Sequence, residues 1–191
     1  FWIPYIKKTT AYSQGLHVTL DQETAHHCLS VSENQRSVTL GEHFQSLPSD
    51  PERFDVMSCV LGWEKFTAGR HYWDVEIEGT RVGWAVGVAR ESVRRKGDIN
   101  FSPEEGIWAV QYFSNLQSPL LQLTLSRSFS QSFISSLYLL RKVRVSLDYE
   151  VGRVEFSDPG SGSSLFTFSS ACFTGQRVCP FFWLSTSEPK G

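Results

Sequence analysis

The sequence predicts an all-β fold, built as a sandwich of short antiparallel strands. Apolar and polar residues alternate in many short runs, and turn-forming residues separate these runs. No segment shows a convincing helical period of about 3.6 residues in its apolar positions. Aromatic residues make up 14% of the chain, and large flat side chains suit the space between two stacked sheets.

Ten strands are expected, because in each range the apolar residues at every second position would share one face of a sheet. The clearest example is residues 71–79, where Trp73, Val75 and Ile77 alternate with three acids. Turns of suitable chemistry follow several of these strands, at residues 78–79, 151–152 and 158–164. In chain order, the expected strands are residues 16–21, 28–32, 37–41, 71–79, 81–89, 106–113, 142–149, 152–158, 164–169 and 178–184.

Other structures are expected between the strands. Residues 49–54 and 102–106 could supply one or two short helical turns, because a serine cap is followed by an early proline. Residues 124–140 are rich in serine with scattered apolar residues, which favours a loop leading into a strand. Residues 1–15 are expected to form an N-terminal linker segment, and no internal linker divides the chain that follows.

The acidic face of residues 71–79 raises the question of catalysis. Two carboxylates at positions i and i+2 of a strand lie about 7 Å apart, which could form half of a glycosidase-like site. However, Asp74, Glu76 and Glu78 would all be exposed, and nothing apolar would raise one pKa to make a proton donor. The pattern therefore favours the solvated outer face of a sheet.

Charge and hydropathy exclude several classes of partner. The formal net charge is −2, so the chain as a whole does not suggest a polyanion partner. Residues 90–97 carry four basic side chains that could grip phosphates, but no aromatic residue is interleaved with them, so nucleic acid is not expected. No apolar run approaches the roughly 20 residues of a membrane span, and no membrane contact is expected of this domain.

Metal, cofactor and catalytic motifs are not found. The four cysteines form no C-x-x-C pair, and their apolar neighbours predict buried, reduced thiols in a reducing compartment. His26 and His27 would point to opposite faces of a strand, which makes a poor metal pair. There is no G-x-S-x-G, no glycine-rich phosphate loop and no H-E-x-x-H. No enzyme activity, catalytic residue, metal or cofactor is expected.

Three short patches give the chain a resemblance to a known family. They read LDQ at residues 20–22, WDVE at 73–76 and LDYE at 147–150. With their surroundings, they resemble the PRY–SPRY domain of tripartite-motif (TRIM) ubiquitin ligases and butyrophilins, whose signature patches are LDP, WEVE and LDYE. The resemblance implies a bent, concanavalin-like jelly-roll sandwich, with residues 16–60 as the PRY part and 61–191 as the SPRY part. It also implies that the WDVE strand is scaffold.

The same resemblance implies a function in protein recognition. The domain would recognise the substrate or ligand of a TRIM-type E3 ubiquitin ligase in the cytoplasm, through loops at one edge of the sandwich, in a setting such as innate immunity. The partner would be a protein or peptide. The isolated domain is expected to be monomeric, and a full-length protein dimeric through a coiled coil outside this chain. Residues 84–97 and 102–110 resemble TRIM more than butyrophilin sequences.

Two alternatives remain open. One is the cytoplasmic ligand-sensing domain of a butyrophilin-type receptor, although Ala85 stands where the resemblance implies a histidine of a phosphate-binding pocket. The other is a sugar-binding or scaffold sandwich without a ligase link, since this architecture also serves lectins. Binding of antibody is not expected either, because Gln111 and Phe113 replace tryptophans that some TRIM members use.

The candidate contact residues are those at the loops that the family uses. An exposed aromatic such as Phe113 or Trp183 beside polar groups would suit a binding hot spot, unless Trp183 closes the core instead. The candidates are residues 42–45 together with Asn34, Gln35, Arg36, Arg81, Ala85, Phe101, Gln111, Phe113, Ser114, Asn115, Trp183, Leu184, Ser185 and Thr186.

Arg81 suggests a hypothesis about the ligand. No acidic residue adjoins it after Gly79, so its guanidinium could take a carboxylate in a bidentate grip, with nearby aromatic walls. The partner would then be a peptide segment with an acidic group or a free C terminus. The alternative is that Arg81 is a solvated charge of a hairpin.

Overall fold

The computed structural model describes residues 5–11, 18–41, 50–78, 82–113, 120–123 and 140–186. Within these ranges, side chains are described for residues 18–41, 50–78, 83–112 and 140–185. The described part contains no helix, and every strand pairing in it is antiparallel. The all-β antiparallel sandwich expected from the alternating pattern is confirmed.

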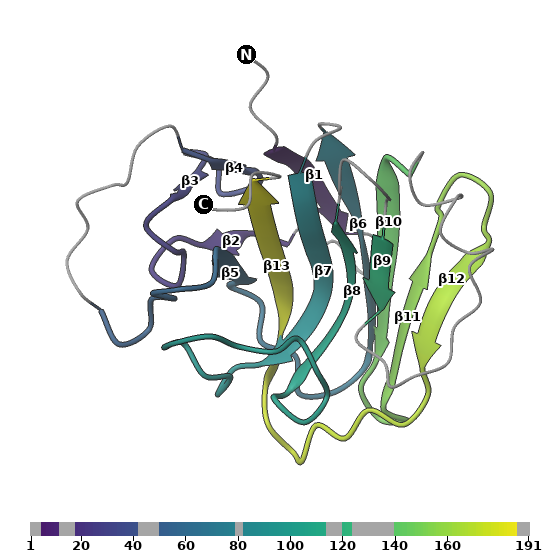
Figure 1. The fold of residues 1–191 in the computed structure, drawn as a ribbon. Helices are drawn as coiled ribbons and strands as arrows, with labels where there is room; N and C mark the ends of the chain where they lie inside the picture. Colours follow the sequence, from purple (N-terminus) through teal and green to yellow (C-terminus); the bar gives the residue numbers. More distant parts are fainter. Residues whose placement is uncertain are drawn as a thin grey trace.

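Two sheets form the sandwich, one behind the other in Figure 1. The seven-stranded sheet has the order β12 (Ser164–Phe168), β11 (Arg153–Ser157), β10 (Lys142–Asp148), β6 (Arg70–Glu78), β1 (Tyr5–Ala11), β4 (Val38–Leu40) and β3 (Leu29–Val31). The six-stranded sheet has the order β2 (Leu20–Asp21), β5 (Cys59–Gly62), β13 (Val178–Thr186), β7 (Val82–Arg90), β8 (Ile107–Phe113) and β9 (Leu120–Leu123). Strands distant in sequence are therefore neighbours in both sheets.

The N-terminal segment differs from its expected role as a linker. Residues 5–11 form β1, which lies between β6 and β4 inside the seven-stranded sheet. Ile6 pairs with Ile77 and Thr9 pairs with Val75, and the register shifts between them. This position is set by pairing with a strand some 70 residues away, which a local pattern does not show. The expected division at residues 60/61 falls within β5.

The two expected helical turns are single reverse turns instead. Arg53 N donates to Asp50 O at 3.2 Å, and Gly106 N donates to Pro103 O at 3.0 Å. Neither turn extends into a helix, because the backbone directly after each turn forms hydrogen bonds with other segments of the chain. Phe54 N donates to Thr24 O at 3.1 Å, and Ile107 begins β8.

The main core fills the space between the two sheets. In β6 the side chains of Trp73, Val75 and Ile77 are buried, and the acids between them are half-buried. Trp108 and Phe182 reach the same core from β8 and β13. The apolar face expected for this strand is confirmed over residues 71–78, whereas the acids are half-buried instead of fully exposed.

The acidic face of β6 is neutralised by the neighbouring strand β10. Asp74 accepts two hydrogen bonds from Arg144, at 2.6 and 2.9 Å, and Glu76 lies 2.7 Å from the ammonium of Lys142. The hydrogen bond with Asp74 raises the pKa of Arg144, and the one with Glu76 raises the pKa of Lys142. Asp74 and Glu76 are therefore paired with cations of β10 and help to hold the two strands together.

Replacing Glu76 with glutamine is expected to lower the free energy of unfolding by less than about 1 kcal/mol, since its pair with Lys142 is solvated. Asp74→Asn is the matched variant on the same strand face. Its loss should be larger, about 1.5–3 kcal/mol, because it breaks a bidentate and less exposed pair. Urea denaturation of both variants measures the difference. Equal losses would contradict the assigned geometry.

Candidate partner-binding face

Three of the sequence-predicted contact residues meet in one row on the six-stranded sheet. Trp183 of β13 lies opposite Ala85 of β7, and Ala85 lies opposite Gln111 of β8. Directly opposite residues of paired strands project from the same face. Because Phe182 and Leu184 point into the main core, this row, hereafter the Trp183 row, lies on the outer face of the sheet.

A second hydrophobic cluster covers this outer face. Ala85 and Trp183 belong to it, and Phe101 joins from the segment between β7 and β8. The Phe101 ring meets Trp183 edge to face, with centroids 5.6 Å apart. Figure 1 shows that segment running beside the lower part of the six-stranded sheet. We call this group of side chains the outer cluster.

Burial corrects the expected exposure of several candidates. Trp183 is only 6% exposed, Phe101 3% and Ala85 not at all, so each helps to close the outer cluster. Gln111 is also buried. Leu184 faces the main core, where a partner does not reach it. The physical reason is that the segment after β7 adds a further layer over this face of the sheet.

Residues 55–58, hereafter the rim segment, lie beside β13 and carry two apolar side chains that are not fully buried. Val56 is 50% exposed, and Met57 is half-buried against the outer cluster. Ser58 O accepts a hydrogen bond from Leu184 N at 3.2 Å, which fixes the rim segment beside β13. Sequence reasoning missed these residues. The available signal was an apolar pair placed between polar residues where the strand pattern is interrupted.

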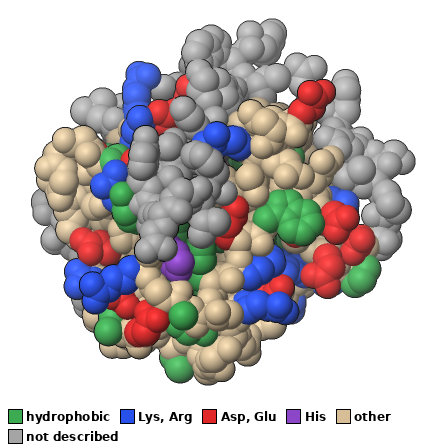
Figure 2. Space-filling model, turned by 180° about the vertical axis from the view of Figure 1, so that it is seen from behind, with side chains coloured by type: hydrophobic (Ala, Val, Ile, Leu, Met, Phe, Trp, Pro, Cys, Tyr) green, Lys and Arg blue, Asp and Glu red, His purple; other side chains and the backbone are tan. Residues whose placement is uncertain are grey.

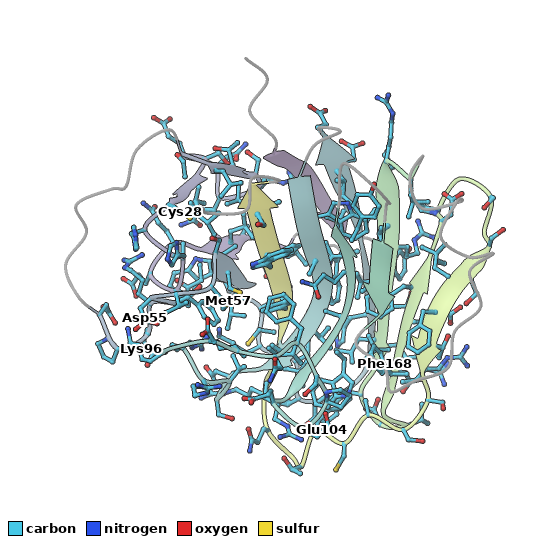
Figure 3. The ribbon with its side chains drawn as sticks, viewed as in Figure 1. Cys28, Asp55, Met57, Lys96, Glu104 and Phe168 are labelled. Carbon is cyan, nitrogen blue, oxygen red and sulfur yellow. The ribbon has the colours of Figure 1, made fainter. Side chains whose placement is uncertain are left out.

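The basic run at residues 90–97 makes hydrogen bonds to the rim segment and to the residues just before it. Lys96 Nζ donates to the backbone oxygens of Asp50 and Arg53, both at 2.7 Å, and Gly97 N donates to Asp55 Oδ1 at 2.8 Å. Figure 3 shows Asp55, Met57 and Lys96 on the side of the sheet where β5 lies. The cations here are used for internal hydrogen bonds.

Arg95, in the same run, is almost completely buried. Its guanidinium lies over the Phe54 ring at 5.0 Å, and Nη2 donates to Glu91 O at 2.7 Å. Burial lowers the pKa of Arg95, against an opposing effect of Glu52. On the side of the molecule that faces away in Figure 1, Figure 2 shows acidic and basic side chains intermixed, without a large area of one charge sign.

The hairpin between β3 and β4 carries Asn34, Gln35 and Arg36. The side chain of Asn34 is exposed, and its Oδ1 accepts hydrogen bonds from Ser32 Oγ at 2.7 Å and from Arg36 N at 3.1 Å. Gln35 has a positive φ of 57°, and its carbonyl accepts from Leu20 N at 2.7 Å. The hairpin is thereby tied to β2, at the edge of the six-stranded sheet. Strand β4 also contacts β13.

Other candidates lie at one end of the six-stranded sheet. Val82 pairs with Thr186, so β7 begins where β13 ends, and Ser185 is half-buried beside them. Phe113 ends β8 at the same end, with its backbone alone described. The remaining candidates lie outside the described residues: Arg81, Ser114, Asn115 and residues 42–45. The same holds for residue 79 of the expected turn at 78–79 and for residues 124–139 of the expected loop.

The histidines and cysteines depart from expectation in two ways. His26 and His27 lie in a turn, and their rings are 4.0 Å apart instead of on opposite faces of a strand. Cys59 and Cys179 are buried, but Cys28 is half-buried and Cys172 is exposed. All four are free thiols. Within the described ranges, no group of three His, Cys, Asp or Glu residues could hold a metal ion, and no helix could cross a membrane.

Comparison with protein families decides the relationship. Residues 18–66 match the SPRY-associated domain, PRY, and residues 70–190 match the SPRY domain. The chain belongs to the PRY–SPRY family. SPRY domains are non-catalytic, protein-binding modules, and this one carries the sandwich described above.

Relatives of this SPRY domain occur in two classes of protein. Butyrophilin subfamily 2 member A2 from Homo sapiens is 43% identical over 90% of the chain and 31% of its own length. Zinc finger protein RFP from Homo sapiens is 39% identical over 98% of the chain and 35% of its own length. E3 ubiquitin-protein ligase TRIM11 from Rattus norvegicus is 37% identical over 98% of the chain and 38% of its own length. The chain spans about a third of the length of these relatives.

A solved structure supports the fold of the SPRY domain. The crystal structure of the TRIM65 PSpry domain superposes with a TM-score of 0.61, covers 90% of each chain and is 18% identical. By contrast, the expected preference for TRIM over butyrophilin sequences is wrong, because the butyrophilin is the more similar of the relatives compared above. The short stretches behind that expectation include β7 and β8, which are scaffold strands of the sandwich.

Proposed function

We propose that this SPRY domain binds a protein partner over the Trp183 row and the rim segment. The observation that carries the proposal is Met57, which is half-buried against the outer cluster and follows the exposed Val56 in a segment that Ser58 O ties to β13. A partner side chain packed there would bury the apolar surface of Val56 and Met57, which is supported from beneath by the aromatic rings of the outer cluster. Interface hot spots have this combination of a packed centre and a polar surround.

The buried candidates have a supporting role in this proposal. Trp183 and Phe101 pack edge to face and form the buried base of the proposed binding face. Val56 is exposed and Ser185 half-buried, so both are accessible to a partner. Asn34, at the exposed tip of the hairpin between β3 and β4, would extend the contact toward β4, which itself contacts β13. The acidic-peptide hypothesis for Arg81 remains a separate prediction.

The longer protein would use this module in one of two ways. In a TRIM-type ligase the domain would select the substrate for ubiquitination, and in a butyrophilin-type receptor it would sense a ligand in the cytoplasm. The higher identity to butyrophilin subfamily 2 member A2 favours the receptor context. The domains encoded upstream distinguish the two, since a RING domain indicates the ligase, and immunoglobulin domains with a membrane span indicate the receptor.

Substitution of Val56 by aspartate tests the proposed face, with Val151→Asp as its matched control. Both valines are exposed, at 50% and 62%, but Val151 lies in the turn between β10 and β11. A partner is first identified by affinity capture and mass spectrometry, and its Kd is then measured for the parent and both variants. Val56→Asp should weaken binding at least about tenfold, or about 1.4 kcal/mol, because a charge would be desolvated in the interface.

The control variant should bind like the parent. Melting temperatures of both variants should stay close to that of the parent, because surface substitutions change stability little. If folded Val56→Asp binds as tightly as Val151→Asp, the proposed face is incorrect.

A further inference from the structure

Cys28 has a contact set that the other cysteines lack. Its Sγ lies 2.8 Å from Nδ1 of His26 and 3.2 Å from the hydroxyl of Ser58. Cys28 itself is half-buried, just before β3, whereas His26 is buried. Figure 3 shows Cys28 on the same side of the molecule as Asp55 and Met57. A nucleophile, a base and a hydroxyl are therefore grouped where two segments distant in sequence meet.

The backbone fixes which nitrogen of His26 can act as a base. Nε2 lies 3.1 Å from the carbonyl oxygen of Asp55. A carbonyl oxygen only accepts hydrogen bonds, so Nε2 carries a proton and donates it. Nδ1 of the neutral ring then presents its lone pair to Cys28, and Cys28 N also points to it at 3.2 Å. The base is thus held in one tautomer by a separate segment, which is the arrangement of activated thiols.

The other three cysteines provide internal comparisons. Cys59 and Cys179 are completely buried, and burial raises the pKa of both thiols, which favours the unreactive protonated form. Cys172 is exposed, and within the described ranges its thiol has no hydrogen-bond partner. Exposure alone therefore favours reaction at Cys172, and activation by a base favours reaction at Cys28. The two criteria give opposite rankings.

We propose that Cys28 is a site of covalent oxidation by hydrogen peroxide, with His26 as the base. The sulfur attacks one peroxide oxygen, an S–O bond forms and the O–O bond breaks. The thiol proton passes to Nδ1 of His26 and then to the departing hydroxide, which leaves as water. The products are a sulfenic acid on Cys28 and one molecule of water. Sulfur loses two electrons and the peroxide gains two.

The surroundings suit a small oxidant in particular. Cys28 is only half-exposed, so a compact reactant such as a peroxide reaches the sulfur more readily than a bulky one. Ser58 Oγ lies 3.2 Å from the sulfur, and its hydroxyl can donate a hydrogen bond to the oxygen on sulfur. Asp55 and Ser58 belong to the rim segment, so the oxidation would take place where Cys28 and His26 contact that segment.

Competition between two thiols of the same molecule tests the proposal. The reduced chain, residues 1–191, is treated with limiting iodoacetamide at neutral pH, and labelling of each cysteine is followed by peptide mass spectrometry. Cys28 should react at least about threefold faster than Cys172, although it is less exposed. In a parallel sample, hydrogen peroxide followed by dimedone should give the sulfenic adduct predominantly at Cys28. Equal or faster reaction at Cys172 in either sample would overturn the proposal.

Substitution of His26 by glutamine distinguishes the effect of His26 as a base from its effect on the local structure. The glutamine amide can still donate to Asp55 O, but it offers no basic nitrogen to Cys28. The labelling rate of Cys28 should fall at least about threefold, with the rate at Cys172 and the melting temperature unchanged. A folded variant whose Cys28 reacts as fast as in the parent would contradict the role of His26. If the variant does not fold, the ratio of rates in the parent still decides whether Cys28 is activated.

Discussion

Replacement of Trp73 by alanine is expected to lower the free energy of unfolding by about 3–5 kcal/mol, the usual cost of truncating a buried aromatic side chain. Trp73 is completely buried in the main core and stacks on Phe66, with ring centroids 5.9 Å apart. Domains of this kind are stable by only about 5–15 kcal/mol, so the variant should be marginally folded at best. Urea denaturation followed by circular dichroism measures the loss.

Trp73→Phe is the matched control, because it keeps an aromatic ring at the same place. The indole Nε1 of Trp73 is buried and has no hydrogen-bond partner among the described residues. Removal of this unsatisfied group offsets part of the lost packing, so the loss should be under about 2 kcal/mol. Tolerance of Trp73→Ala, or equal losses in both variants, would mean that this side of β6 does not face the core.

Alternation along the chain predicted the strands that separate a core from solvent. In β6 and β10 the burial alternates residue by residue, and in both the expected range agrees closely with the observed one. The same rule missed β5, whose four residues Cys59–Gly62 are all buried. One face of β5 meets the main core and the other meets the outer cluster, so no polar residue marks a solvent face.

The position of the candidate site was predicted in part, for a related reason. The sequence placed Ala85, Gln111 and Trp183 among the candidates, and the register of three strands brings them into one row. It did not show that Phe101 would cover that row, because a covering segment has no periodic pattern of its own. Small residues on this face of β7 gave a partial signal, because Ala85 and Ala89 belong to the outer cluster. Gly87 lies between them, and an added Cβ there would be only 2.1 Å from Trp108 O of the neighbouring strand β8.

Replacement of Gly152 by alanine should be the second large loss, about 3 kcal/mol or more. Two costs combine there. Gly152 has a φ of +64°, which costs an L-residue about 1–2 kcal/mol. Its added Cβ would also lie 2.2 Å from Ala171 O, so the backbone would have to move. Ala171 N donates to Gly152 O at 2.7 Å, and this contact would be lost or distorted.

Gly162→Ala isolates the first of these costs from the second. Gly162 has a similar φ of +72°, but no atom lies within 4 Å of its added Cβ. Its loss should therefore be about 1–2 kcal/mol, from the backbone conformation alone. The excess in Gly152→Ala measures the contact with Ala171, which lies two residues before Phe173 of the main core. If urea denaturation gives equal losses for the two alanine variants, the close approach of Gly152 to Ala171 is incorrect, and positive φ alone explains both glycines.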